Sequence, residues 1–143
     1  MEDIFTLSDW AKYTDHKALD DLDLPGIYCL AHFEKPPTTA PSVTAKEIIY
    51  IGETTEQNIA RRLYQFGRTA FKRYPAHSGG SRYSDTYLMS IPVDRPPENL
   101  YVAIMAFRSS NPEETKVYIK YLERAAIWSY FQTNHAIPSC NAC

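Results

Sequence analysis

The chain has 143 residues, 44% hydrophobic and 22% charged, with a formal net charge of −2; these values exclude a disordered or fibrous protein and fit one globular domain, residues 1–143. No apolar run reaches the roughly 18 to 20 residues that span a bilayer, and the acidic start Met1-Glu2-Asp3 does not fit a signal peptide. Three cysteines, an odd number, favour reduced thiols, so we expect a cytoplasmic protein with no membrane partner.

The first part of the chain predicts a short helical segment followed by two strands. Residues 1–24 are expected to form a brace of one or two helices, with Ser8 as an N-cap. Strands follow at 26–33 and 47–53, where β-branched and aromatic residues cluster between turn residues. The proline-containing link 34–46 is expected to be a loop, because the strands on either side should pair.

A basic helix is predicted at 55–73, capped by Thr54 or Thr55. Its apolar residues have the i, i+4, i+7, i+11 spacing of a core-facing stripe. They are Ile59, Leu63, Phe66 and Ala70. On a helical wheel Arg62 borders this stripe and Arg61 lies nearly opposite, so Arg62 should lie at the edge of the core and Arg61 in solvent.

The second part predicts one more strand and one more helix. Residues 75–99 look irregular, with a short strand possible at 86–91, and a strong strand follows at 100–107. Asn111, Pro112 and Glu114 provide a cap, a proline at the first helical position and an acid at the third, which starts a helix at 112–132. The expected fold class is α/β (α+β), with a small, mainly antiparallel three-stranded sheet flanked by helices.

Glu123 lies on the last predicted helix among apolar neighbours. Its positions at i−4, i+3, i+4 and i+7 are occupied by Ile119, Ala126, Ile127 and Tyr130. A buried carboxylate needs a compensating partner. That partner is either a cationic side chain, from Lys120 or an arginine elsewhere, or a hard divalent cation such as Mg²⁺.

Two tripeptides in the predicted strands, Gly26-Ile27-Tyr28 and Tyr50-Ile51-Gly52, resemble the motifs of the GIY-YIG nuclease family. This family includes homing endonucleases, a repair incision subunit and restriction enzymes. Further positions resemble the family in the same order: the helix residue Arg62, the loop residue His77, the later Glu123 and the late Asn141. The resemblance spans residues 25 to 141 and implies that residues 25–143 form a catalytic core of GIY-YIG type.

The resemblance implies a metal-dependent endonuclease that hydrolyses DNA phosphodiester bonds. Glu123 would hold one Mg²⁺ (or Mn²⁺) ion against the phosphate, and Arg62 would contact the phosphate oxygens. Tyr28 and Tyr50 would act as general base or orient the attacking water, and His77 would transfer a proton or contact the phosphate. Ionising a tyrosine at pH 7 costs roughly 4 kcal/mol, so a nearby cation has to lower the pKa of the base.

A basic segment suggests where DNA would bind. No acidic residue lies between Glu56 and Asp85, and contacts to the phosphate backbone position a protein without reading sequence. The residues expected to contact DNA are Arg61, Arg68, Lys72, Arg73, Arg82 and Asn141. A sequence preference would have to come from residues 75–99, from the 34–46 loop or from a second copy of the chain in a homodimer.

Two other classes of protein stay open. The net charge of −2, together with Phe66 where many relatives carry histidine or tyrosine, favours a nucleic-acid-binding or interaction module that lacks turnover. A purely structural protein would leave the side chains of Tyr28, Tyr50, Arg62 and Glu123 scattered. The nuclease hypothesis requires that they converge.

Overall fold

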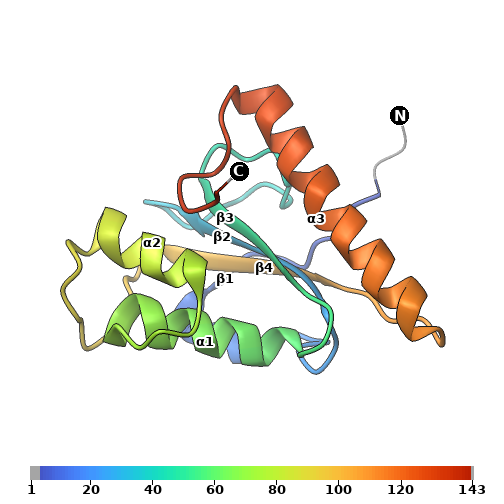
Figure 1. Ribbon diagram of the computed structural model, residues 1–143. Helices are drawn as coiled ribbons and strands as arrows, with labels where there is room; N and C mark the ends of the chain where they lie inside the picture. Colours follow the sequence, from blue (N-terminus) through green and yellow to red (C-terminus); the bar gives the residue numbers. More distant parts are fainter. Residues whose placement is uncertain (1–3, 143) are drawn as a thin grey trace.

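The computed structural model describes residues 4–142, which form a central sheet covered by helices on both faces (Figure 1). In chain order the elements are β1 (Ala11–Lys12), the 3-10 helix η1 (Tyr13–Ala18), β2 (Gly26–His32), β3 (Ile48–Thr54), α1 (Ile59–Lys72), α2 (Ser78–Tyr87), β4 (Leu100–Ala106) and α3 (Pro112–Asn134). Helices α1 and α2 lie side by side on one face, and α3 crosses the other.

The sheet has the strand order β1-β4-β2-β3, and all neighbouring strands are antiparallel. The predicted antiparallel sheet flanked by helices is therefore confirmed, with four strands in place of three. The additional strand, β1, has only two residues and pairs with β4. Two residues are too few for a period-two pattern, which explains why the sequence did not indicate this strand.

Strand alternation divides the core between the two faces of the sheet. From β2, Tyr28 and Leu30 pack with α1 and α2 in one hydrophobic cluster, whereas Cys29 packs on the opposite face with residues of α3. Strand β2 is central and pairs along its length with β4 on one side and β3 on the other. Strand β3 is therefore an edge strand, around which groups from both faces can approach each other.

The N-terminal segment matches the predicted helical brace only in part: the 3-10 helix η1 covers Tyr13–Ala18, whereas residues 4–12 contain no helix. Ser8 is not an N-cap: its amide donates to the Ile104 carbonyl oxygen (2.8 Å), and its hydroxyl accepts from the Ile104 amide (2.9 Å). Extended backbone here satisfies polar groups along the edge of β4, which a short helix could not do. Leu19 and Leu22 still pack against the core.

The basic helix α1 starts later than predicted. Asn58 is the N-cap, and its side chain accepts from the Arg61 amide (2.8 Å). The predicted caps, Thr54 and Thr55, precede the helix. The Thr54 hydroxyl donates to the Gln57 carbonyl oxygen (2.9 Å) and accepts from the Gln57 amide (3.1 Å), closing a turn before the helix.

Helix α2 (Ser78–Tyr87) lies within the region 75–99 that the sequence suggested to be irregular; residues 88–99 have no helix or strand, as expected, but the short strand suggested at 86–91 does not form. The first turn of α2 contains glycines, which are poor helix formers, and tertiary packing overrides that preference. A Cβ on Gly80 would lie 2.8 Å from the Phe66 carbonyl oxygen, so only glycine allows α2 to approach α1 this closely. The His77 side chain caps the helix by accepting from the Gly80 amide (3.1 Å).

Helix α3 begins as predicted. The Asn111 side chain accepts from the amides of Glu113 (2.9 Å) and Glu114 (3.3 Å), and Pro112 occupies the first helical position. The helix extends to Asn134, slightly past the predicted end. No helix within residues 4–142 combines the length and the apolar character needed to cross a membrane.

Candidate functional site

Three rings from three elements meet on the α1 face of the sheet. Tyr28 comes from β2, Tyr50 from β3 and His77 from the residue before α2. The ring centres lie 6.0 Å apart for the two tyrosines, 5.4 Å for Tyr50 and His77, and 6.1 Å for Tyr28 and His77. These three predicted site residues therefore converge.

Two glycines make room for the tyrosine rings. A Cβ on Gly52 would lie 2.6 Å from Cζ of Tyr28 and 2.5 Å from Cε2 of Tyr50. A Cβ on Gly79 would lie 2.6 Å from Cε1 of Tyr50. All three distances are far inside van der Waals contact, so the position of the Tyr50 ring requires glycine at these positions of β3 and α2.

His77 is a neutral hydrogen-bond donor in this arrangement. Its Nδ1 accepts from the Gly80 amide (3.1 Å), which assigns the proton of the neutral ring to Nε2. Nε2 lies 2.7 Å from the Tyr28 hydroxyl oxygen and donates to it. Burial, together with the charge of Arg62, lowers the pKa of His77 to about 3. The expected proton transfer by His77 near neutral pH is therefore not what this geometry favours.

Arg62 lies beside the rings, at the border of the core as predicted. Its Nη1 donates to Oε1 of Gln65 (2.6 Å) and to the Ala76 carbonyl oxygen (3.4 Å). Burial raises the pKa of both Tyr28 and Tyr50, and the Arg62 charge opposes this rise without cancelling it. Both phenols consequently carry their protons at neutral pH.

The two tyrosines differ in access. The Tyr28 side chain is fully buried, while Tyr50 is 9% exposed. Tyr50 also lies within electrostatic reach of Arg82 and Glu123: the Arg82 charge lowers the pKa of Tyr50 and the Glu123 charge raises it. Tyr50 is therefore the residue at which the ring cluster and the Glu123 carboxylate come near each other.

Glu123 belongs to α3, the helix on the opposite face of the sheet from α1 (Figure 1), and 22% of its side chain is exposed. It forms an ion pair with Nε of Arg124 (3.5 Å), whose side chain is 86% exposed. Burial and the charge of Glu53 raise the pKa of Glu123, and Arg124 and Lys120 only partly oppose them. The carboxylate is thus half-buried and incompletely compensated.

Glu53 is a candidate that the sequence reasoning missed. It follows Gly52 on β3 and pairs with Ile27, so strand alternation places it on the α3 face. Its Oε2 is buried and has no hydrogen-bond partner among the described residues. The signal that could have identified it is a carboxylate at an inward position of an otherwise apolar strand.

The Glu53 and Glu123 carboxylates fit a hard divalent cation. No group of three or more histidine, cysteine, aspartate or glutamate side chains within residues 4–142 could hold a metal ion. Mg²⁺, however, commonly binds one or two carboxylates and completes its shell with water and phosphate oxygens. Glu53 and Glu123, whose charges interact, are the two carboxylates that could serve as such ligands, and Oε2 of Glu53 is buried with no hydrogen-bond partner among the described residues.

Three of the basic residues predicted to contact DNA donate to carbonyl or carboxylate oxygens within the protein: Lys72, Arg73 and Arg82, whose Nη1 donates to the Cys140 carbonyl oxygen (3.5 Å). Nη1 of Arg73 lies 3.0 Å from Oδ1 of Asp85 in an ion pair. Nζ of Lys72 donates to the Val93 carbonyl oxygen (3.1 Å). Their charges are therefore less available to an external phosphate than those of Arg61 and Arg68, which are exposed on α1.

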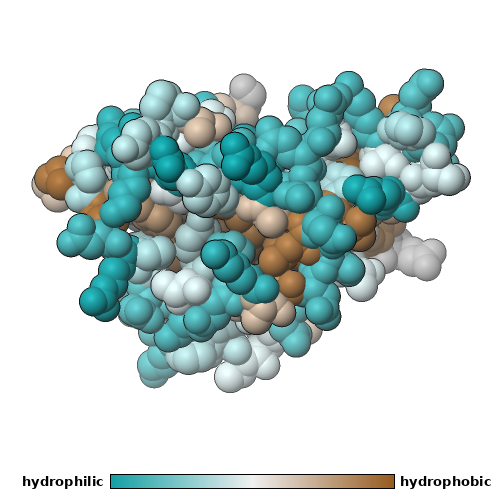
Figure 2. All heavy atoms as spheres, turned by 90° about the horizontal axis from the view of Figure 1, so that it is seen from below, coloured by the Kyte–Doolittle hydropathy of each residue, from teal (hydrophilic) through white to brown (hydrophobic). Residues whose placement is uncertain are grey.

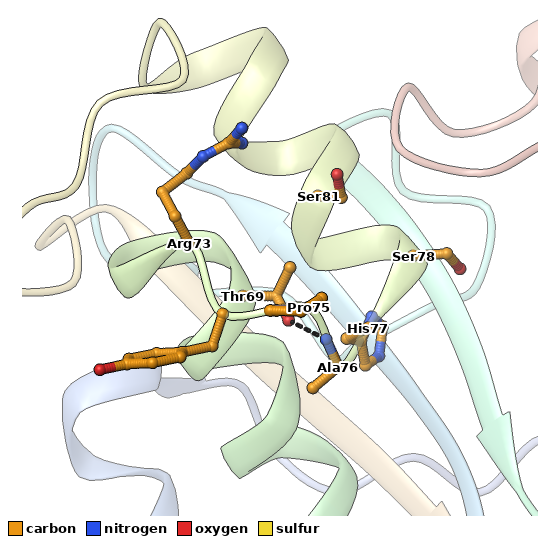
Figure 3. A pocket seen from close by; sticks show the side chains of 8 residues that line it. Thr69, Arg73, Pro75, Ala76, His77, Ser78 and Ser81 are labelled. Atoms are coloured by element: carbon orange, nitrogen blue, oxygen red, sulfur yellow. Dashed lines mark hydrogen bonds between the residues drawn. The ribbon is translucent and has the colours of Figure 1, made fainter.

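A hollow of about 350 Å³ lies beside His77 and is lined in part by Thr69, Arg73 and Ser81 (Figure 3). The Ala76 amide donates to the Thr69 hydroxyl (3.0 Å), which fixes the loop that leads from α1 to His77. The hollow therefore gives solvent a route to the α2 end of the ring cluster.

Asn141 anchors the C-terminal tail to the sheet. Its Oδ1 accepts from the Ile51 amide and its Nδ2 donates to the Ile51 carbonyl oxygen, both at 2.9 Å. The Cys140 amide donates to the Ile49 carbonyl oxygen (2.7 Å) along the same edge. The Asn141 amide is thus engaged by β3, and the DNA contact that was expected of it stays a prediction.

A scan against protein-family models and searches of curated proteins and of solved structures found no match for this chain.

Proposed function

We propose that the chain is a metal-dependent endonuclease of GIY-YIG type that hydrolyses DNA phosphodiester bonds. One observation carries the proposal: the hydrogen-bonded pair of Tyr28 and His77 lies beside Tyr50 and Arg62 at an edge strand that also bears Glu53. Phosphodiester hydrolysis uses a positioned water, a cation for the phosphate charge and help for the leaving oxygen.

Glu53 and Glu123 would hold the divalent ion. A bound Mg²⁺ or Mn²⁺ ion supplies charge neutralisation at the phosphate and a lower pKa for a bound water. The orphaned oxygen of Glu53 and the raised pKa of Glu123 both point to a missing positive charge at this place. Arg62, with its fork of donors, would bind phosphate oxygens on the other side of Tyr50.

The two tyrosines take different roles in this proposal. Tyr28 is buried and its oxygen accepts from Nε2 of His77, so it is a positioning residue. Its own proton stays available to orient Tyr50 or a water. Tyr50 is the more accessible ring and would contact the attacking water. Phe66 packs against His77 at 5.5 Å between ring centres, so an imidazole reaches Tyr28 from the start of α2 rather than from α1.

The test is cleavage by the purified chain with supercoiled plasmid, branched DNA and RNA as substrates. Reactions contain Mg²⁺, Mn²⁺ or EDTA, and nicking of DNA is expected only with a divalent ion. Folded protein that nicks none of these substrates with either metal would rule the proposal out.

Three carboxylate variants locate the ion. Glu123→Gln and Glu53→Gln should each reduce nicking by at least about 100-fold, the usual cost of losing a strong electrostatic contact in a transition state. Glu56→Gln is the matched control, because Glu56 lies just beyond β3 with a side chain that is 79% exposed and paired with Lys116. Normal cleavage by Glu123→Gln would refute the metal assignment.

The second candidate is a nucleic-acid-binding module without turnover. It is favoured by the raised pKa of both tyrosines, since neither is poised as a base at neutral pH without a further cation. This candidate predicts DNA binding that is unaffected by EDTA and no nicking under any condition. The plasmid assay and a binding assay on the same preparation separate the two functions.

A further inference from the structure

Two exposed tyrosines alternate with two arginines along the outer side of α1. We propose that this ladder, Arg61-Tyr64-Arg68-Tyr74, binds single-stranded nucleic acid, with bases stacking on the tyrosine rings and phosphates held by the arginines. The inference rests on the proposed function in one respect, since it names unpaired DNA as the form presented to the site. The contacts that define the ladder are independent of catalysis.

The ladder is built by the helix and its C-cap. Arg61, Tyr64 and Arg68 are three and four residues apart, so they lie on one side of α1, opposite the buried stripe. The chain then turns at Arg73, which has a left-handed conformation (φ 67°), and the Tyr74 amide donates to the Arg68 carbonyl oxygen (3.1 Å). This turn returns the Tyr74 ring to the side of Arg68.

The rings and guanidinium groups contact one another in sequence. Cζ of Arg68 lies 4.1 Å from the centre of the Tyr74 ring and 5.8 Å from that of Tyr64, and Cζ of Arg61 lies 5.6 Å from the Tyr64 ring centre. Nη1 of Arg68 also donates to the Tyr64 hydroxyl (3.0 Å). Side chains held in this way lose less conformational freedom when a ligand binds.

The arginines of the ladder keep their charge available. Among residues 4–142 neither Arg61 nor Arg68 forms an ion pair with a carboxylate. Hydrophilic residues cover most of the surface seen from the α1 side (Figure 2). A guanidinium group that stacks on a ring still presents N–H donors at its edge, which suits a phosphate.

The tyrosines point to unpaired bases rather than to a duplex. Tyr64 is 50% exposed and Tyr74 is 53% exposed. Bases within a duplex already stack on one another, whereas the faces of single-stranded bases are free to stack on aromatic side chains. Duplex binding through phosphates would leave both rings without a partner.

The ladder also adjoins the candidate site. It borders a hollow of about 360 Å³ whose other walls are Gln65, Pro75 and Ala76. Arg62 donates to two of these wall residues, Gln65 and Ala76, and His77 follows directly in the chain. A strand lying along the ladder would therefore lead toward Arg62 and the ring cluster.

The test is fluorescence anisotropy with a labelled oligothymidylate and with a duplex of equal length, in EDTA so that no cleavage occurs. Tyr64→Leu and Tyr74→Leu should each weaken binding to the single strand by about tenfold, the size expected for one lost base stack. Duplex binding should change less than about twofold, because phosphate contacts remain. Tyr64→Phe keeps the aromatic ring, so it should bind the single strand as the wild type does, unlike Tyr64→Leu.

Tyr121→Leu is the matched control, since Tyr121 is 53% exposed on α3, outside the ladder. Three outcomes would overturn the inference. The tyrosine variants could lose affinity equally for single strand and duplex, Tyr121→Leu could lose as much affinity as they do, or the wild type could fail to bind oligothymidylate. If the protein nicks plasmid but does not prefer the single strand over the duplex in the binding assay, the ladder proposal is refuted and the nuclease proposal stands. If the protein prefers the single strand but nicks no substrate, the nuclease proposal is refuted and the ladder proposal stands.

Discussion

The environment of His77 determines what chemistry this residue can perform. Capping α2 engages Nδ1, and bonding to Tyr28 engages Nε2, so both ring nitrogens have fixed partners. Protonating Nδ1 would break the cap and would place a cation next to Arg62 in a buried position. His77 therefore orients the Tyr28 hydroxyl and the start of α2 as a neutral group.

Acid stability tests this state of His77. Its folded-state pKa is lowered to about 3, below the roughly 6.5 of an unfolded histidine. Between these values the unfolded chain binds the proton, so the stabilising contribution of neutral His77 is lost as the pH falls from about 6.5 toward 3. From about pH 7 to about pH 5 the loss should be about 2 kcal/mol.

The measurement is urea unfolding of the wild type and of His77→Asn at these two pH values. Asparagine keeps a good N-cap but does not titrate, so the variant should lose about 2 kcal/mol less on acidification. Other histidines with lowered pKa, His16 and His32, are present in both proteins and cancel in the comparison. The same pH dependence in both proteins would contradict a neutral, buried His77.

Gly52 is the second test at the residue scale. In Gly52→Ala the new methyl would collide with both tyrosine rings, so we expect a destabilisation of about 1 to 3 kcal/mol, as in other overpacked cores. The rings would also separate, and nicking should fall with them. Denaturant unfolding and near-ultraviolet circular dichroism check this. Ser78→Ala, at an exposed position of α2, is the control and should leave stability and the circular dichroism spectrum unchanged. Unaltered stability in Gly52→Ala would contradict the packing of the two rings against Gly52.

Part of the site was predictable from sequence and part was not. Tyr28 and Tyr50 lie on strands that the sequence predicts from their β-branched and aromatic residues. The helical wheel of α1 correctly predicted that Arg62 borders the core. Glu53 and the neutral state of His77 depend on groups brought from α3 and α2. For Glu53 the only local signal is a carboxylate at an inward position of an apolar strand, and for the neutral state of His77 there is none, because distant elements cause the burial.

At the scale of elements, the C-terminal tail completes the sheet at its open edge. The Asn141 side chain imitates a backbone amide and pairs with Ile51, and Cys140 pairs with Ile49. An unpaired edge strand is a site for unwanted association. Docking of the tail therefore protects β3 and fixes the strand from which Tyr50 projects.

Asn141→Ala tests this docking. The variant loses two hydrogen bonds to Ile51, each worth about 1 kcal/mol, so stability should fall by about 1 to 2 kcal/mol. The Ile51 amide should exchange with solvent faster, as measured by hydrogen exchange, while DNA affinity stays within about twofold. Asn141→Asp keeps one acceptor and should show a smaller effect on the Ile51 amide. Unchanged exchange, or a selective loss of DNA affinity, would instead favour the predicted nucleic-acid contact.

The elements themselves differ in how well sequence identified them. Helix α3 has a complete local start signal, Asn111 followed by Pro112, and the structure has the same start. Helix α2 begins with Ser-Gly-Gly, which indicates a turn in isolation, and it forms because Gly80 packs closely on α1. Local sequence signals therefore predicted the helix whose start is determined by capping residues, and failed for the helix that forms because of a tertiary contact.

At the scale of the whole molecule, charge is distributed unevenly around the sheet. The α1 face carries exposed arginines from a segment without acidic residues, while the net charge of the chain is −2. An overall negative charge weakens long-range attraction to DNA, so binding has to depend on the local basic surface. Within that surface Arg61 and Arg68 form no ion pair among the described residues, whereas Arg73 is paired with Asp85.

Salt dependence of DNA binding tests this difference. If Arg61 and Arg68 each neutralise a phosphate, replacing either by alanine should reduce the slope of log affinity against log salt by about 1. Arg73→Ala should change the slope much less, because Arg73 is paired with Asp85 at 3.0 Å and exchanges one carboxylate partner for a phosphate. Anisotropy titrations of a duplex at several salt concentrations give the slopes. A slope change for Arg73→Ala equal to that for Arg61→Ala would mean that the ion pair opens on binding and that the basic surface extends to α2.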